Sequence, residues 1–475
     1  LLEEEGAQAS LGEPGLFYKN EDGLQPGDLS HNKRYLSLSD PVTTSINKLY
    51  ILDRKTGERT MISPEDPKSQ YASAYFGKGD STFYYRTNAG DEFMYLSAYD
   101  ISSGTSEKVL EADWDITSAY QSKDGTYRVV SINEDAQTKI RIDNIKTGEQ
   151  VELPELPEGL ISSVNISDSE ELMAFHVNNS KSPSNLYVYA FNTREYQRLT
   201  DALNPEIDPD HLVQGEVIRY ESFDGLEIPS ILYKPKDLQE GEQHPATLWM
   251  HGGPGGQSRL DYRAMIQFLV NHDYVVLAVN NRGSSGYGKT FYQMDDRKHG
   301  EVDLKDCIWA KKYLAEQDYV DSSAIGIAGG SYGGYLVMAA LTFAPDTFDV
   351  GVNYFGVTNW NRTLKSIPSW WSSYKNAFYQ EIGNPEKDSV MLHEKSPLFY
   401  ADRIGKPFIV LQGANDPRVL KSESDDIVEA ARDNGVPVEY VIFEDEGHGF
   451  VKKENRIEAG EKVLDFLNKQ LRSKN

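Results

Sequence analysis

The sequence IGIAGGSYGGYLVMAAL, at residues 325–341, runs from a short apolar segment through GGSYG into an apolar stretch with helical spacing. The glycines of Gly329-Gly330-Ser331-Tyr332-Gly333 allow a turn so sharp that the serine hydroxyl projects from it. A strand, G-x-S-x-G and a helix in this order predict a nucleophile elbow. Ser331 is then the candidate nucleophile of an α/β-hydrolase domain.

The motif itself is short. Because the chain has 38 glycines among 475 residues, a glycine-rich turn with an uninvolved serine is the alternative. In an elbow, the N-terminus of the following helix faces the reacting atoms and favours developing negative charge. The backbone N–H of Tyr332, directly after the serine, is then expected to be one donor of an oxyanion hole.

A serine hydroxyl needs a base, and two later loops offer its partners. The apolar strand predicted at 408–411 leads into QGANDPRV, and the one predicted at 438–443 leads into EDEGHGF. Both Asp416 and His448 therefore follow strands, in the chain order that this fold uses. We expect Asp416 to orient His448 and His448 to take the serine proton. Asp445 is the alternative orienting acid, and a solvent-exposed loop histidine is the alternative for His448.

The second oxyanion donor is expected after an earlier buried strand, at residues 246–250. That strand runs into HGGPGG, where glycines let a backbone N–H approach a reacting carbonyl without obstruction. Gly253 is the predicted donor. A loop that is merely flexible is the alternative.

Five stretches now stand in one order along the chain. They are HGGPGG at 251–256, NRGSSGYG at 281–288, GGSYGG at 329–334, GANDPRV at 413–419 and DEGHGF at 445–450. From about Val217 onward the chain thereby resembles the prolyl oligopeptidase family of serine peptidases, especially its acylaminoacyl-peptidase-like branch. The resemblance implies Ser331, Asp416 and His448 as a catalytic triad, with Gly253 and Tyr332 as the oxyanion hole.

The same resemblance implies two substrate-binding residues. Arg418 would bind a backbone carbonyl of the peptide, which suits a permanently charged, fork-shaped donor. A surface arginine paired with acidic neighbours is the alternative. Trp371 belongs to an aromatic group (Trp360, Trp370, Trp371 and Tyr374) and would line the pocket for the residue before the scissile bond; core packing is its alternative.

The N-terminal part repeats a turn followed by a strand. The turns are SHNKRYL at 30–36, GKGDSTF at 77–83, SKDGTY at 122–127 and SDSEEL at 167–172. Their first residues are 47, 45 and 45 apart, which is typical of β-propeller blades. A β-sandwich is the alternative, although an even period over four units is not expected of one.

We therefore predict two domains, an all-β propeller at 1–205 and an α/β-hydrolase domain at 206–475. Seven blades of this length would need roughly 300 residues. The propeller is consequently expected to be incomplete, with about four blades and a truncated N-terminus; a genuinely small propeller is the alternative. The polar segment TDALNPEIDPD at 200–210 is the predicted linker.

Composition limits the partners. A net charge of −26 disfavours nucleic acid and anionic membranes, and the single cysteine, Cys307, excludes a disulfide framework and cysteine-based metal sites. We expect no cofactor, no metal and no membrane span, and the cytoplasm is the default location. A homo-oligomer is compatible with the sequence.

The expected function is that of a serine peptidase acting on short peptides through an acyl-enzyme. Two alternatives stay open, a carboxylesterase of the same fold and a propeller binding module with an inactive hydrolase domain. The sequence does not separate endopeptidase from exopeptidase action, nor does it indicate the preferred residue at the cleavage site.

Overall fold

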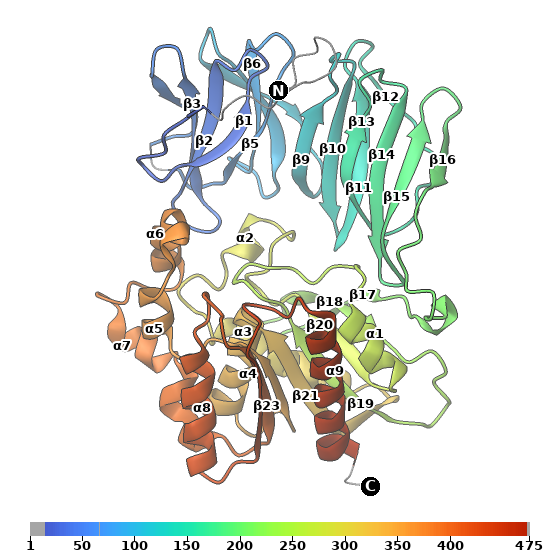
Figure 1. The fold of residues 1–475 in the computed structure, drawn as a ribbon, viewed down its shortest axis with the longest axis vertical. Coiled ribbons are helices and arrows are strands. Elements are labelled where there is room, and N and C mark those ends of the chain that lie inside the picture. Colours follow the sequence, from blue (N-terminus) through green and yellow to red (C-terminus); the bar gives the residue numbers. More distant parts are fainter. Residues whose placement is uncertain (1–14, 66, 473–475) are drawn as a thin grey trace.

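The computed structural model describes residues 15–65 and 67–472. Small antiparallel sheets from the N-terminal part form one layer, and a large sheet with helices forms the other (Figure 1). Residues 1–14, which the predicted propeller included, lie outside the described residues. Within the described part of the chain, no helix has the length and apolar character needed to cross a membrane.

Four blades, each an antiparallel meander of four strands, make up the N-terminal layer. The first blade contains β1 Gln25–Leu29, β2 Tyr35–Pro41, β3 Asn47–Asp53 and β4 Arg59–Met61, and the second contains β5 Tyr71–Phe76, β6 Thr82–Thr87, β7 Tyr95–Asp100 and β8 Thr105–Leu110. The third blade contains β9 Asp115–Gln121, β10 Tyr127–Glu134, β11 Gln137–Asn144 and β12 Glu149–Gln150. The fourth blade contains β13 Leu160–Ile166, β14 Leu172–Asn179, β15 Ser182–Ala190 and β16 Glu195–Arg198. A single parallel pair, Thr138 with Leu160, joins the third blade to the fourth. The predicted propeller is confirmed.

The repeated sequence turns connect the first two strands of every blade. In each turn the first residue donates its N–H to the carbonyl five residues later, as Ser30 does to Tyr35 at 2.9 Å and Ser122 to Tyr127 at 2.8 Å. The fourth residue has positive φ, whether it is Gly125 at 74° or Glu170 at 57°. The repeat in the sequence therefore arises because the same turn conformation recurs in every blade.

Neighbouring turns are also hydrogen-bonded to one another. The Asp80 carboxylate accepts the N–H groups of His31 at 2.8 Å and Asn32 at 2.9 Å, in the preceding blade. The Lys78 N–H donates to the Gln121 side chain at 2.8 Å, which extends the link to the third blade. Polar turns and the apolar clusters between blades together hold the four sheets side by side.

The C-terminal layer contains one eight-stranded sheet in the order β17-β18-β20-β19-β21-β22-β23-β24. Its strands are β17 Glu216–Glu221, β18 Glu227–Tyr233, β19 His244–Met250, β20 Val275–Val279, β21 Val320–Gly330, β22 Gly351–Tyr354, β23 Phe408–Gly413 and β24 Val438–Phe443. The first two form a hairpin with its turn at Asp224-Gly225, and from β20 to β24 all neighbours are parallel. This is the α/β-hydrolase domain that the sequence predicts.

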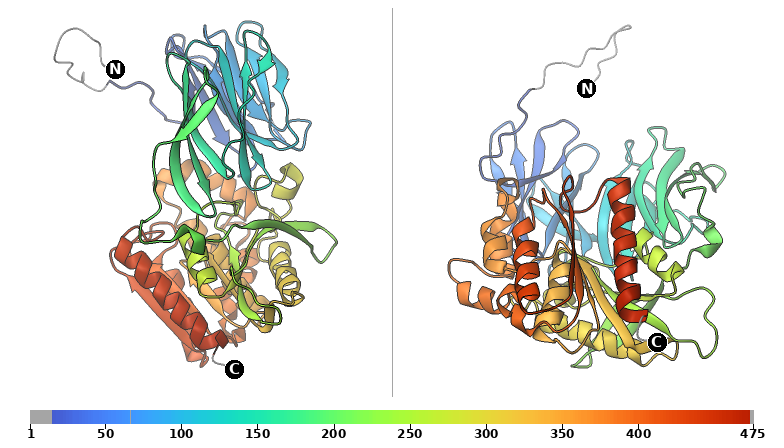
Figure 2. Two further views of the ribbon diagram at one scale, coloured as in Figure 1. Left: turned by 90° about the vertical axis from the view of Figure 1, so that its right-hand side faces the viewer. Right: turned by 60° about the horizontal axis from the view of Figure 1, so that its bottom comes forward.

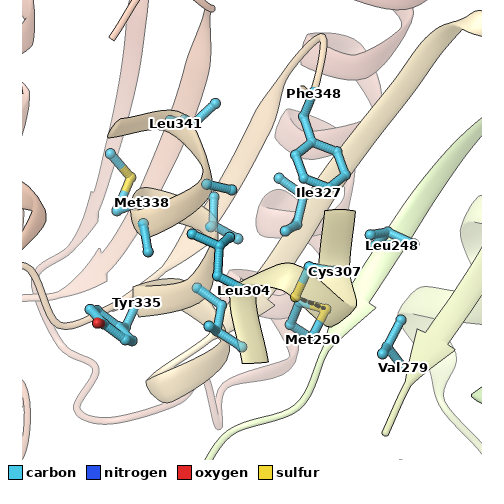
Figure 3. Packing of buried hydrophobic residues seen from close by; sticks show 14 of the residues in the cluster. Leu248, Met250, Val279, Leu304, Cys307, Ile327, Tyr335, Met338, Leu341 and Phe348 are labelled. Atoms are coloured by element: carbon cyan, nitrogen blue, oxygen red, sulfur yellow. Dashed lines mark hydrogen bonds between the residues drawn. The ribbon is translucent and has the colours of Figure 1, made fainter. Parts of the chain in front are cut away.

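Helices cover both faces of this sheet. The α-helices described in this part of the chain are α1 Ala264–Asn271, α2 Lys289–Tyr292, α3 Val302–Ala315, α4 Tyr332–Phe343, α5 Trp360–Lys365, α6 Ser372–Glu381, α7 Ser389–Glu394, α8 Lys421–Asp433 and α9 Lys453–Leu467. Apolar residues of α1 and α9 pack on one face, and those of α3, α4 and α8 pack on the other. Cys307 of α3 is buried among the apolar residues of this second face, with its sulfur 3.8 Å from that of Met250 (Figure 3).

All four blades contact the catalytic domain, the first two through the loop between their second and third strands and the last two through the end of their second strand. The Thr44 hydroxyl donates to Glu381, and the Thr290 hydroxyl donates to Glu92 at 2.8 Å. In the last two blades Asn133 donates to Gln257 at 2.8 Å, and Asn178 accepts the Tyr262 N–H at 2.8 Å. Figure 2 shows the resulting stack from two further directions. The segment 199–215 connects the layers, and the boundary between residues 205 and 206 stays a prediction.

Candidate active site

Ser331 occupies the turn between β21 and α4 in a strained backbone conformation, with φ 56° and ψ −115°. A non-glycine residue adopts such angles only where the surroundings enforce them. A Cβ on Gly329 would lie 2.6 Å from the backbone of Gly333, and one on Gly333 would overlap the carbonyl oxygen of Met250. Both glycines of the motif are therefore required by close backbone contacts, and the turn has the geometry of a nucleophile elbow.

Asp416 and His448 meet at the carboxyl ends of β23 and β24. One carboxylate oxygen of Asp416 accepts the N–H groups of Arg418 at 2.8 Å and Val419 at 3.0 Å, which fixes the side chain. The other oxygen lies 2.7 Å from Nδ1 of His448. Since an ionised carboxylate only accepts, Nδ1 carries the proton and Nε2 keeps its lone pair for a substrate proton.

Asp445, the alternative orienting acid, points elsewhere. It forms an ion pair with Lys452 and accepts a hydrogen bond from Asn455 at 2.9 Å, and its side chain is half exposed. The Asp416 side chain is fully buried, whereas His448 retains 11% of its exposure. Of the two acids, the structure thus brings only Asp416 to the histidine.

Phe355 is a site residue that sequence reasoning missed. Its ring centroid lies 4.8 Å from that of His448, and it also approaches Gly330 beside the serine. Phe355 has a φ of 40°, an outlier for a bulky residue, and its N–H donates to the Leu411 carbonyl at 2.8 Å. The loop after β22 is thereby bent so that an aromatic ring packs on the imidazole.

The loop 251–256 lies against the elbow, where the second oxyanion donor was predicted. A Cβ on Gly252 would be 3.6 Å from that of Ser331. Among the described residues the N–H of Gly253 has no hydrogen-bond acceptor. Tyr332 opens α4, where N–H groups have no partner within the helix. Both predicted donors are free for a ligand, and their assignment as the oxyanion hole stays a prediction.

The structure brings Arg418 and Trp371 together. The guanidinium of Arg418 lies 4.9 Å from the centroid of the Trp371 ring, a cation–π contact, and it forms no ion pair with any described residue. Trp371 also packs on Phe378. Trp360, by contrast, is a core residue, 3% exposed and packed on Tyr335. The aromatic group of the sequence is therefore split between a surface and the core.

A buried polar network begins at the Tyr332 side chain. Its hydroxyl donates to Asp303 and lies 2.8 Å from Nδ1 of His299, which must then be the donor to the tyrosine oxygen. Nε2 of His299 faces Glu381 at 3.9 Å, and Glu381 accepts the hydroxyl of Thr44 in the propeller. The network connects the domain interface with the residue that follows the candidate nucleophile.

Burial dominates the electrostatics of this network. It raises the pKa of Glu381 to about 7, that of Asp295 to about 7 and that of Asp303 to about 6, and it lowers the pKa of His299. Ligand atoms of Asp295, His299 and Asp303 lie within 4.8 Å of one another, a spacing that could hold a metal ion. Since the Tyr332 hydroxyl already bonds two of these residues, we describe the group as a hydrogen-bonded network.

Two family models match the two parts of the chain. One, described as the prolyl oligopeptidase family, matches residues 260–474, and the other, described as the N-terminal β-propeller domain of prolyl oligopeptidase, matches residues 19–202. Both matches agree with the layers seen in the fold.

Curated relatives point to the same family. Dipeptidyl aminopeptidase BIII of Pseudoxanthomonas mexicana is 33% identical over 387 residues, which cover 79% of this chain and 56% of the relative. Dipeptidyl peptidase family member 6 of Caenorhabditis elegans is 31% identical over 66% of this chain and 45% of its own length. The chain thus spans about half the length of these relatives.

Solved structures share the fold. A puromycin-hydrolyzing peptidase of Mycobacterium tuberculosis superposes with a TM-score of 0.84 at 21% identity, over 94% of this chain and 69% of that one. An acylaminoacyl peptidase of Pyrococcus horikoshii gives a TM-score of 0.74 at 22% identity, over 94% and 70% of the two chains. With its propeller, its hydrolase sheet and both matched models, the chain belongs to the prolyl oligopeptidase family.

Proposed function

We propose that this chain is a serine peptidase in which Ser331 is the nucleophile, His448 the general base and Asp416 the orienting acid. The observation that carries the proposal is the 2.7 Å contact from Asp416 to Nδ1 of His448, in a loop beside a strained serine elbow. A carboxylate held by backbone N–H groups fixes the imidazole tautomer that a serine nucleophile requires.

The proposed reaction proceeds through an acyl-enzyme. The Ser331 oxygen attacks the carbonyl carbon while its proton moves to Nε2 of His448, and the N–H groups of Gly253 and Tyr332 stabilise the oxyanion. The C–N bond then breaks, and the leaving amine takes the proton from the imidazolium. A water molecule attacks the ester in the same way, releases the acid product and restores the serine.

Arg418 and Trp371 are the proposed contacts for the acyl part of the peptide. The Trp371 ring supports the guanidinium, whose N–H groups are free to bind a backbone carbonyl. The printed names of the relatives include dipeptidyl aminopeptidase and acylamino-acid-releasing enzyme, which supports peptides as the substrate class for this chain. We also propose the domain division at residues 205/206.

Labelling with a fluorophosphonate probe tests the catalytic assignment. We expect one label, located on Ser331 by peptide mass spectrometry and absent from Ser331→Ala. Hydrolysis of peptide p-nitroanilides then separates a peptidase from a carboxylesterase, since the latter would cleave only p-nitrophenyl esters. An unlabelled Ser331 would support the alternative of a binding module with an inactive hydrolase domain.

A further inference from the structure

A cavity of about 350 Å³ opens directly beside Ser331. The loop after β19 and the first turn of α1 form its walls, and Gly252 and Phe355 line it together with the serine. Arg259, Asp261 and Arg263 also line it. Two arginines and one aspartate leave one net positive charge on this lining, in a chain whose net charge is −26. Burial lowers the pKa of His251, which also borders the cavity, so this imidazole adds no charge at neutral pH.

The order of the strands places this cavity relative to the Arg418–Trp371 pair. Strand β19 lies on one side of β21, whose end carries Ser331, and β22 and β23 lie on the other. The cavity belongs to the β19 side, whereas Arg418 follows β23. A peptide that crosses the serine with its acyl part on Arg418 would therefore have its leaving part in the cavity.

The guanidinium groups of Arg259 and Arg263 keep N–H donors that have no acceptor in the described part of the chain. Nη2 of Arg259 donates to the Asn133 side chain at 3.1 Å, the Gln137 carbonyl at 2.8 Å and the Thr138 hydroxyl at 3.0 Å, all uncharged groups of the third blade. Arg263 uses Nε alone, in its pair with Asp261 at 2.9 Å. Within the described chain, neither Nη1 of Arg259 nor either terminal nitrogen of Arg263 makes a hydrogen bond.

Arg259 also lacks a carboxylate partner among the described residues. It forms no ion pair with any described residue, and its Nε is buried without a hydrogen-bond partner. Burial lowers the pKa of Arg259, which reflects the cost of holding a cation away from water. An anion in the cavity would reduce that cost, and a carboxylate matches the fork of a guanidinium in shape and charge.

We infer that the cavity binds a carboxylate on the leaving part of the substrate, held by Arg259 and Arg263. The volume is near the lower end of the range for small-molecule pockets, so the leaving part is short, one or two residues that end in a free carboxylate. The inference rests on the proposed function and names its substrate class. An acidic side chain on the first leaving residue would supply the same chemistry.

Matched peptide libraries test this inference. N-acetylated tripeptides and tetrapeptides with randomised residues are prepared with a free C-terminal carboxylate or with a C-terminal amide, and a third set carries aspartic acid amide at the C-terminus. Initial rates by liquid chromatography and mass spectrometry should be about 10- to 100-fold higher for the free acids than for the plain amides, as expected for loss of charge-assisted hydrogen bonds. Rates for aspartic acid amides equal to those of the free acids would still support a carboxylate site and assign its source to the side chain.

Variants of the two arginines test whether the preference for a free carboxylate arises in the cavity. Arg263→Gln and Arg259→Gln should lower the ratio of the rate on free acids to the rate on amides about 10-fold or more. Arg263 is the safer position, because its side chain is 52% exposed and pairs only with Asp261. Arg456→Gln, on an exposed position of α9, is the matched control and should change neither rate.

Fluorophosphonate labelling of Ser331 distinguishes failure of the carboxylate site from failure of the proposed peptidase function. A labelled protein that cleaves acids, plain amides and aspartic acid amides at equal rates would overturn the carboxylate site and leave the peptidase proposal intact. Equal preference for acids in Arg263→Gln, Arg259→Gln and the parent protein would also overturn it. A protein that is neither labelled nor active would overturn the proposed function and this inference with it.

Discussion

Two histidines lie near the Ser331 turn, His299 at the Tyr332 hydroxyl and His448 on the Phe355 ring, and each has a carboxyl group beside it, yet their surroundings differ. His448 contacts one carboxylate that backbone N–H groups hold, and it retains 11% of its exposure. His299 is 1% exposed, and burial raises the pKa of the acids around it. A histidine beside an acid is thus insufficient as a sign of catalysis; one open ring nitrogen and one fixed carboxylate are the distinguishing features.

Replacement of His448 should reduce catalysis, whereas replacement of His299 should reduce stability. His448→Ala removes the proposed base, and we expect kcat on a peptide p-nitroanilide to fall about 10⁵-fold or more. The free energy of unfolding should change by only about 1 kcal/mol, because Asp416 keeps the backbone N–H groups of Arg418 and Val419 as partners. A His448→Ala variant with more than a tenth of the parent kcat would contradict the assignment.

Asp416→Asn is the next largest expected effect. The amide side chain would stabilise the wrong imidazole tautomer, so we expect kcat to fall about 10⁴-fold. Asp445→Asn is the matched control in the neighbouring loop, and its kcat should stay within about 2-fold of the parent. Equal losses in the two variants would show that the 2.7 Å contact to Nδ1 of His448 does not select the orienting acid.

The surroundings of His448 could be predicted from the sequence more readily than those of His299. Ser331, Asp416 and His448 each follow an apolar strand, so their places at the carboxyl end of the sheet follow from the order of parallel strands, and their catalytic roles stay a proposal. The blades could also be predicted from the sequence, because each is a local unit with its own turn.

The buried network could not be predicted in the same way. Asp295, His299 and Asp303 are four residues apart, a helical spacing that could have attracted attention. Their partners Glu381 and Thr44 come from a distant helix and from the propeller, so only the tertiary fold reveals the burial that raises the pKa of these acids. Phe355 was missed for a related reason, since nothing in a single sequence indicates positive φ at a phenylalanine.

His299→Ala should affect stability more than chemistry. Removal of the ring leaves a cavity and takes a hydrogen-bond partner from the Tyr332 hydroxyl, so the free energy of unfolding should fall by about 2–4 kcal/mol. Chemical denaturation monitored by tryptophan fluorescence measures this loss. If His299→Ala unfolds like the parent protein but loses kcat as His448→Ala does, the two histidines do not divide stability and catalysis between them.

The smallest expected effect concerns pH and the contact between propeller and hydrolase. Burial holds the pKa of Glu381 at about 7, whereas the unfolded chain releases this proton near 4.5. The folded protein therefore binds more protons between these values, and the contribution of Glu381 to stability is lost as pH rises toward 7. Asp295 acts in the same direction, while His299, whose pKa is lowered, contributes stability that is lost as pH falls below about 6.5.

Glu381→Gln isolates the carboxyl from these opposing groups. The amide does not titrate and can still accept the Thr44 hydroxyl, so the midpoint of thermal unfolding should fall less between pH 5 and pH 8 than in the parent protein. Glu386→Gln, at an exposed position nearby, should reproduce the parent profile. A Glu381→Gln profile identical to that of the parent would mean that this carboxyl is already ionised in the folded protein at pH 5. The contrast between the two histidines would then rest on exposure alone, because the acid nearest the propeller would be ionised.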